Sequence, residues 1–193
     1  QPLPKKNIDT GAGLERITSV VQNKKNNFET DLLFPILEEI AKKCNKKYGE
    51  NDKTDFSLKV ITDHARAVTF LVGDGVLPSN EGRGYILRRI LRRAIRHARL
   101  LGNEELFLNT IIDKVIDVMK VAYEDLEEKK EYIKKVVLIE EEKFSKTLDQ
   151  GIKLVNDEIL GAKSRGETKL SSELVFKLHD TFGFPYELTE EIC

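Results

Sequence analysis

Apolar residues recur every three to four positions along most of this 193-residue chain, which is the period of an amphipathic α-helix. The clearest stripe lies within residues 57–72 and consists of Leu58, Ile61, Ala65, Val68 and Leu71. Comparable stripes predict helices over residues 14–22, 30–48, 106–123, 126–160 and 172–179, and a last helix from Leu188 onward. A strand is expected only over residues 8–13. The pattern therefore predicts a mainly all-α fold, a helical bundle preceded by one strand.

Proline, aspartate and glycine set the expected limits of these helices. Pro35 is compatible with the helix over residues 30–48 only in its first turn, where Asp31 can cap free N–H groups. Gly102 is placed to end the helix that precedes it. Gly151 interrupts the longest stripe, and we expect the helix to bend there.

Composition supports a folded, helix-rich protein. Charged residues make up 34% of the chain and apolar residues 40%, which argues against disorder. Cys44 and Cys193 lie far apart and the three histidines are scattered, so no metal-ligand spacing occurs. No apolar stretch approaches the roughly 20 residues of a membrane span, and no signal-peptide pattern is present. We therefore expect free thiols, no metal site, no membrane contact and a cytoplasmic location.

The basic residues are unevenly distributed, although the formal net charge is only -1. Seven of the ten arginines fall within residues 83–99, and no acidic residue occurs there. One side of the predicted helix carries Arg88, Arg92, Arg96 and Arg99, with Arg89 and Arg93 about 100° further round. Guanidinium groups match phosphate oxygens, so this segment predicts binding of a nucleic acid.

Two features of this region have a second interpretation. The arginines can instead pair with acidic residues of the segment 124–142, because adjacent helices of a bundle often form such salt bridges. Asn80 lies in a glycine-rich loop over residues 73–84, where it can either contact the edge of a base or cap the following helix. Residue spacing alone does not decide between these alternatives.

A second glycine-containing segment, Asp9-Thr-Gly-Ala-Gly-Leu-Glu-Arg16, lies near the start of the chain. Glycines let a backbone approach a planar or phosphorylated ligand, and an arginine can hold a triphosphate. A turn followed by one surface arginine explains the pattern equally well.

Three motifs follow one another along the chain. The first is Asn7-Ile-Asp-Thr-Gly-Ala-Gly-Leu-Glu-Arg16. The second comprises His64-Ala-Arg-Ala-Val-Thr-Phe70 and Gly73-Asp-Gly-Val-Leu-Pro-Ser-Asn-Glu-Gly-Arg-Gly-Tyr-Ile-Leu-Arg-Arg89, and the third is Phe176-Lys-Leu-His-Asp-Thr-Phe-Gly-Phe-Pro185. Together they resemble the alanyl-tRNA synthetase family, as class II motif 3 and as the start and end of the tRNA-recognition region. The likeness begins at about Leu3, and tyrosine often replaces His179 or Phe182 in the family.

The resemblance implies roles for residues of the first motif. In class II synthetases, motif 3 is a strand and a helix that line the ATP site. Arg16 matches the arginine that binds an ATP phosphate, and Gly11 and Gly13 match the glycines that let adenosine approach. Asp9 matches the acidic residue that binds the alanine ammonium group. ATP with Mg²⁺ is accordingly expected as the cofactor of the intact enzyme.

The resemblance also implies how RNA is bound. Asn80 and Asp180 match the residues that read a G·U wobble pair in the acceptor stem of tRNA(Ala). A carboxylate suits the unpaired guanine 2-amino group, which the shallow RNA minor groove exposes. Without the resemblance, Asp180 is explained as a helix N-cap or a turn residue. The arginines expected on the RNA are Arg83, Arg88, Arg92 and Arg96.

The resemblance further implies that the chain is a fragment. Residues 1–26 would form the C-terminal edge of the catalytic domain, and residues 27–193 a helical domain that recognises the acceptor stem. Motifs 1 and 2 are absent, as is the editing domain, the only part expected to hold zinc. The intact enzyme would use ATP to join alanine to tRNA(Ala). We expect the isolated fragment to be inactive and to have no cofactor bound.

Two other functions fit the same sequence. A generic helical module would grip nucleic-acid phosphates through Arg83–Arg99 without reading sequence. A purely structural bundle would pair all of these arginines internally and would bind no nucleic acid, even at low salt.

Overall fold

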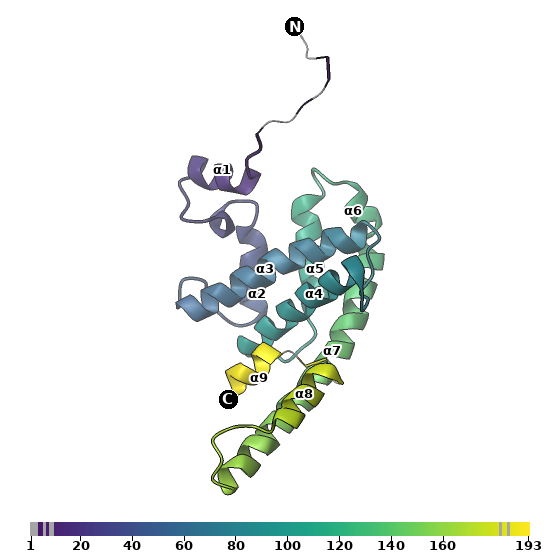
Figure 1. Cartoon of the computed structure of the whole chain (residues 1–193). Helices are drawn as coiled ribbons and strands as arrows, with labels where there is room; N and C mark the ends of the chain where they lie inside the picture. Colours follow the sequence, from purple (N-terminus) through teal and green to yellow (C-terminus); the bar gives the residue numbers. More distant parts are fainter. Residues whose placement is uncertain (1–3, 6, 8–9, 182, 185) are drawn as a thin grey trace.

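The computed structural model of this protein describes residues 4–5, 7, 10–181, 183–184 and 186–193. These residues form α-helices joined by loops, with no strand among them (Figure 1). The helices are α1 (Leu14–Val21), α2 (Phe34–Lys43), α3 (Asp52–Gly73), α4 (Gly82–Leu100), α5 (Leu108–Met119), α6 (Asp125–Glu128), α7 (Lys130–Ser164), α8 (Ser172–Asp180) and α9 (Tyr186–Ile192). A short 3-10 helix, Asn27–Glu29, precedes α2. The expected mainly all-α fold is confirmed.

The core lies where α3 and α4 pack against each other and against the helices around them, chiefly α2, α5 and α7. The stripe predicted within residues 57–72 forms a core face of α3, since four of its five apolar residues are buried there. Other side chains with no exposed surface include Ile36, Leu37, Leu87, Leu91, Ile111, Ile133, Val137 and Phe144. Burying each such side chain contributes about 1.5–3 kcal/mol, so the helical periodicity identified the main source of stability.

The strand expected over residues 8–13 is not confirmed. The described residues Asn7 and Thr10–Gly13 have no regular secondary structure, and Ile8 and Asp9 lie outside the described residues. A strand needs a neighbour for its backbone hydrogen bonds, and the described part of the chain supplies none. The helix expected after Gly13 is present as α1.

The segment 30–48 is less helical than its apolar stripe predicts. Its helix, α2, begins after Leu33, so Asp31 does not cap it, and the backbone N–H of Asp31 instead donates to Gln22 Oε1 at 3.1 Å. The proline does lie in the first turn of α2, as expected. The helix ends at Lys43 because Asn45 adopts a left-handed conformation, with φ of 50°.

Gly102 was expected to end a helix and Gly151 to bend one. Gly102 follows the last turn of α4 with φ of 85°, and its N–H donates to Arg99 O at 2.9 Å, as a helix-ending glycine should. Gly151 does not end or interrupt its helix, because α7 is continuous from Lys130 to Ser164. A side chain at position 151 would instead overlap the ring of Phe184, so the glycine makes room for that ring.

Phe184 anchors the segment that follows α8. Its side chain has no exposed surface, and its backbone N–H donates to Leu178 O at 2.8 Å, which turns the chain back after the helix. The C-terminal half of α7 and α8 project from the bundle, while α9 lies near α4 (Figure 1). This return of the chain brings the end of α8 opposite the arginine-rich helix α4.

Candidate nucleic-acid interface

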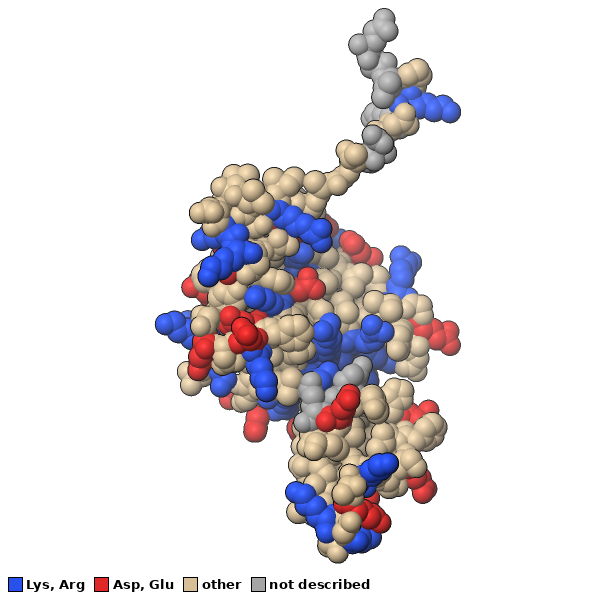
Figure 2. All heavy atoms as spheres, turned by 60° about the vertical axis from the view of Figure 1, so that its left-hand side comes forward, with Lys and Arg blue, Asp and Glu red and all other residues tan. Residues whose placement is uncertain are grey.

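A groove of about 890 Å³ separates α4 from the segment around the end of α8. Asn80 and Asp180, which are a hundred positions apart in the sequence, both line it. Other lining residues are Tyr85, Arg88, Arg89, Arg92, Arg93, Arg96, His179, Gly183, Phe184 and Tyr186. Figure 2 shows basic side chains gathered in the middle of this face, between the bundle above and the projecting lobe below. Among the described residues, the lining of the groove is therefore strongly basic, with Asp180 as its one acidic side chain.

A buried carboxylate of α7 contacts two of the groove arginines from beneath the groove. Glu140, which is only 4% exposed, lies 2.9 Å from Arg92 Nη2 and 3.3 Å from Arg88 Nε. The Arg92 guanidinium also lies over the ring of Phe144, 4.9 Å from its centroid. These contacts leave several of the five N–H donors of each guanidinium for a ligand.

Internal pairing of the arginines is thus correct in part. Besides the two arginines on Glu140, Arg99 pairs with Asp149 of α7 at 3.4 Å and does not line the groove. Arg89 and Arg93 are exposed on the groove wall, and neither forms an ion pair that involves only described residues. The alternative of a purely structural bundle, in which every arginine is paired internally, therefore does not describe α4.

The structure separates the four arginines expected on RNA. Arg88, Arg92 and Arg96 line the groove, whereas Arg83 is exposed outside its lining. Arg89 and Arg93 line the groove although they were absent from the expected set. The sequence showed that these two arginines lie about 100° round the helix from Arg88 and Arg92. It did not show that the groove is wide enough to include them.

Asn80 does not cap α4. The N-cap residue is Glu81, which makes no side-chain cap, and the Asn80 Oδ1 atom accepts a hydrogen bond from Arg88 Nη1. The same guanidinium donates through Nη2 to Pro78 O at 3.4 Å. Gly84 lets this loop lie close to the first turn of α4, since a Cβ there would come 2.3 Å from Leu77 O. The capping alternative for Asn80 is therefore excluded.

Asp180 is the last residue of α8 and is exposed. The alternative of an N-cap or turn residue concerns the segment that begins at Thr181, directly after Asp180. Its carboxylate accepts no hydrogen bond from any described residue, and it remains available to a ligand. Gly183 follows closely with φ of 63°, and a Cβ at that position would come 3.0 Å from Arg92 Nη1. The end of α8 and the arginine helix thus approach each other across the groove.

The residues expected to bind ATP lie elsewhere. Gly11 and Gly13 are exposed just before α1, and Figure 1 shows α1 above the bundle and α9 below it. Arg16 is also exposed, and Asp9 falls outside the described residues. The neighbouring Glu15 is bonded to Arg66 of α3, and this hydrogen bond lowers the pKa of the Glu15 carboxyl. The ion pair links α1 to the bundle.

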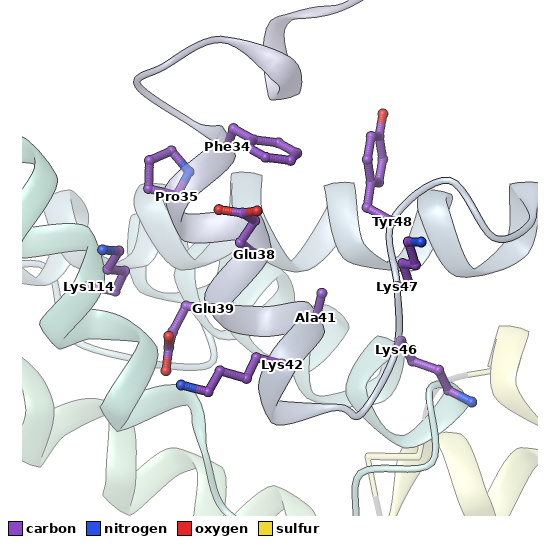
Figure 3. A pocket seen from close by; sticks show the side chains of 10 residues that line it. All are labelled: Phe34, Pro35, Glu38, Glu39, Ala41, Lys42, Lys46, Lys47, Tyr48 and Lys114. Carbon is purple, nitrogen blue, oxygen red and sulfur yellow. The ribbon is translucent and has the colours of Figure 1, made fainter.

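A second cavity, of about 570 Å³, lies beside α2. Figure 3 shows the ring of Phe34 pointing toward Tyr48 across it, and the two rings meet edge to face at 6.2 Å. Acidic and basic side chains are mixed in its lining, and none of the expected site residues is among them. The arginine groove is therefore the better candidate for a nucleic-acid interface.

The described residues contain neither a candidate metal site nor a candidate membrane span. No group of three or more His, Cys, Asp or Glu side chains among them could hold a metal ion. Within the same residues, no helix is both long and apolar enough to cross a membrane. Cys44 is buried and Cys193 exposed, and both are free thiols.

Comparison with known proteins places the whole chain in one family. Residues 1–193 match the family described as tRNA synthetases class II (A). The chain is 69% identical over its full length to an alanine–tRNA ligase of Fusobacterium nucleatum. It is 58% identical to that of Clostridioides difficile and 53% identical to that of Natranaerobius thermophilus, over 98% of the chain in each case. In all three comparisons the chain spans 22% of the length of the relative.

Proposed function

The chain belongs to the class II tRNA synthetase family that includes the alanine–tRNA ligases, and we propose that it serves to bind the acceptor stem of tRNA(Ala). The intact enzyme would activate alanine with ATP and Mg²⁺ and transfer it to the 3′ end of the tRNA. The groove between α4 and α8 is the proposed RNA interface. Asn80 and Asp180 would read a G·U pair there, and the arginines would hold the RNA backbone.

One observation carries this proposal: Asn80 and Asp180 line the same basic groove. Phosphate contacts fix the position of a nucleic acid but carry no sequence information, so reading a base pair needs other side chains. An amide and a carboxylate on opposite walls of the groove are suited to that task. Each is exposed; Asn80 does not cap α4, and Asp180 is the last residue of α8.

The chemistry of a G·U wobble pair fits these two side chains. The guanine 2-amino group projects into the minor groove without its usual cytosine O2 partner, and a carboxylate accepts such a donor well. Side chains can reach base edges in the RNA minor groove because it is wide and shallow. Asp180 would accept from the guanine, while Asn80 would bond to the neighbouring edge.

The arginines would contribute affinity rather than selectivity. Arg88 and Arg92 are held by Glu140, which reduces the freedom they lose when a phosphate binds. Arg89 and Arg93 are exposed on the groove wall, where two further phosphates could approach. Arg83 lies outside the groove lining and would reach the RNA backbone only beyond the groove.

The N-terminal segment would contribute to the alanine and ATP site of the intact enzyme. Arg16 would bind an ATP phosphate, Gly11 and Gly13 would let adenosine approach, and Asp9 would bind the alanine ammonium group. Neither the arginine groove nor the cavity beside α2 is lined by residues of α1. We therefore propose that the 193-residue chain alone does not activate alanine, and alanine-dependent ATP–pyrophosphate exchange is the assay that tests this.

A second candidate function is a module that grips phosphates without reading sequence. The exposed groove arginines, Arg89 and Arg93, favour it because they suit a phosphate but are not aimed at a particular base. Titration of acceptor-stem duplexes that differ only in a G·U or G·C pair distinguishes the two functions. A preference of roughly tenfold for G·U supports base reading, since one specific base contact contributes about 1–3 kcal/mol. Equal affinities support the second candidate.

A further inference from the structure

Glu140 links the inside of the bundle to the loop that carries Asn80. Its carboxylate is 4% exposed and contacts both Arg88 and Arg92, so it lies beneath the groove and cannot meet a ligand in it. Glu140 is also absent from the groove lining. Any effect of this carboxylate on RNA binding must therefore act through the two arginines.

Arg88 connects Glu140 to Asn80, because its guanidinium contacts both side chains. Its Nε atom forms an ion-pair contact of 3.3 Å with Glu140 Oε1, without a hydrogen bond, and its Nη1 group donates to Asn80 Oδ1. A guanidinium has only donors, so the atom of the amide that faces it must be the oxygen. The amide nitrogen is consequently directed away from Arg88, and no described residue accepts a hydrogen bond from it. The orientation of the amide follows from chemistry, although its oxygen and nitrogen have nearly the same shape.

We propose that Glu140 is a positioning residue, which acts through Arg88 to fix the Asn80 amide with its amino group available to the groove. The inference rests on the proposed function, because it assigns the chemical character of the RNA edge that the groove accepts. Asn80 offers a donor and Asp180 offers an acceptor. The matching edge must present an acceptor beside an amino group, as uracil O2 and the guanine 2-amino group do in the minor groove of a G·U pair.

A matched control exists on the same two helices. Asp149 of α7 pairs with Arg99 of α4 at 3.4 Å, but Arg99 lies outside the groove lining. Replacing either carboxylate by its amide removes one negative charge from α7, which breaks one ion pair with α4 at Asp149 and two at Glu140. Only the replacement of Glu140 should alter the Asn80 amide.

The direct test is the ¹⁵N–¹H spectrum of the 193-residue chain without RNA, in which the two side-chain amide signals of Asn80 are assigned by their loss in Asn80→Ala. We expect Glu140→Gln to shift or broaden these signals, and Asp149→Asn to leave them unchanged. Unchanged Asn80 signals in a folded Glu140→Gln protein would overturn the inference. Arg88→Lys provides a second test if Glu140→Gln does not fold, because it keeps a cation beside Glu140 but removes the fork that reaches Asn80.

Binding measurements then separate this inference from the proposed function. If both hold, Glu140→Gln lowers the ratio of G·U to G·C affinity by about threefold to tenfold, and it lowers the ratio no further in an Asn80→Ala background. Additive losses in the two backgrounds would contradict positioning through Asn80. A wild-type chain with no preference for G·U would refute the proposed function, while the amide signals would still decide the role of Glu140.

Discussion

The ring of Phe184 lies directly against the backbone of Gly151, so that a Cβ atom at residue 151 would come 2.0 Å from the ring carbon Cδ2. This contact fixes the chain just after α8 on the middle of α7. Asp180, at the end of α8, is thereby held across the groove from α4. The position of one proposed base-reading residue therefore depends on a glycine 29 positions before it in the chain.

Gly151→Ala should displace the Phe184 ring. We expect a loss of about 1–3 kcal/mol in the free energy of unfolding, because an added methyl group cannot be accommodated without movement of buried atoms. Gly161→Ala is the control in the same helix, where a Cβ would meet only the end of the Arg165 side chain, at 3.1 Å. Its higher helix propensity should stabilise that variant by up to about 1 kcal/mol. Thermal unfolding followed by circular dichroism gives both values, and equal effects of the two substitutions would disprove the close contact.

Glu141 of α7 provides a pH-dependent contribution to stability. Its Oε1 atom accepts hydrogen bonds from the N–H groups of Phe107 at 3.0 Å and Leu108 at 3.1 Å, at the start of α5. Burial raises the pKa of this carboxyl above its ordinary value of 4.5. The protonated form is favoured in the folded state, so this contribution is complete below about pH 4.5 and is lost as the pH rises through the raised pKa.

Glu141→Gln should remove that dependence while keeping an oxygen that accepts from the two N–H groups. Between pH 4.5 and the raised pKa, the free energy of unfolding of the variant should rise relative to that of the wild type by up to about 1.4 kcal/mol per pH unit. Urea unfolding at a series of pH values from 4.5 to 8 measures the difference, with the exposed neighbour Glu142→Gln as the control. A difference between wild type and Glu141→Gln that stays constant with pH would count against this account.

Features that depend on residues close together in the sequence could be predicted, whereas features that depend on contacts between distant residues could not. The core face of α3 was predictable because helical periodicity is local, and Gly102 because a helix-ending glycine acts on its own turn. The cap at Asp31 was wrong because Pro35 lies in the first turn of α2, which therefore begins at Phe34 with Leu33 as its N-cap. No local pattern indicated that Gly151 would receive an aromatic ring from residue 184.

The groove was predictable in its residue types but not in its arrangement. The arginine-rich face of α4 was evident, and its partial neutralisation by a carboxylate of α7 was anticipated as an alternative. Glu140 is buried and contacts two arginines because α4 packs on α7. The spacing of residues along the sequence does not indicate this arrangement. The role of Asp9 stays a prediction, since that residue lies outside the described part of the chain.

Arg89 tests the contribution of the groove wall to RNA affinity. Its side chain is exposed, lines the groove and has no ion-pair partner among the described residues. Arg89→Ala should weaken binding to G·U and G·C duplexes equally and reduce the slope of log K against log salt concentration by about 1. Arg165→Ala removes the same charge from the end of α7, outside the groove lining, and should leave the slope unchanged. Identical slopes for the two variants would show that Arg89 contacts no phosphate.

The most direct test of the central claim is the ratio of G·U to G·C acceptor-stem affinity for the wild-type chain and for Asp180→Asn. Because Asp180 is exposed and accepts no hydrogen bond from the described residues, this near-isosteric change should leave the fold intact. We expect the wild type to prefer G·U by roughly tenfold and Asp180→Asn to lose nearly all of that preference, while keeping its affinity for the G·C duplex. A wild type without the preference, or an Asp180→Asn protein that retains it, would contradict the account.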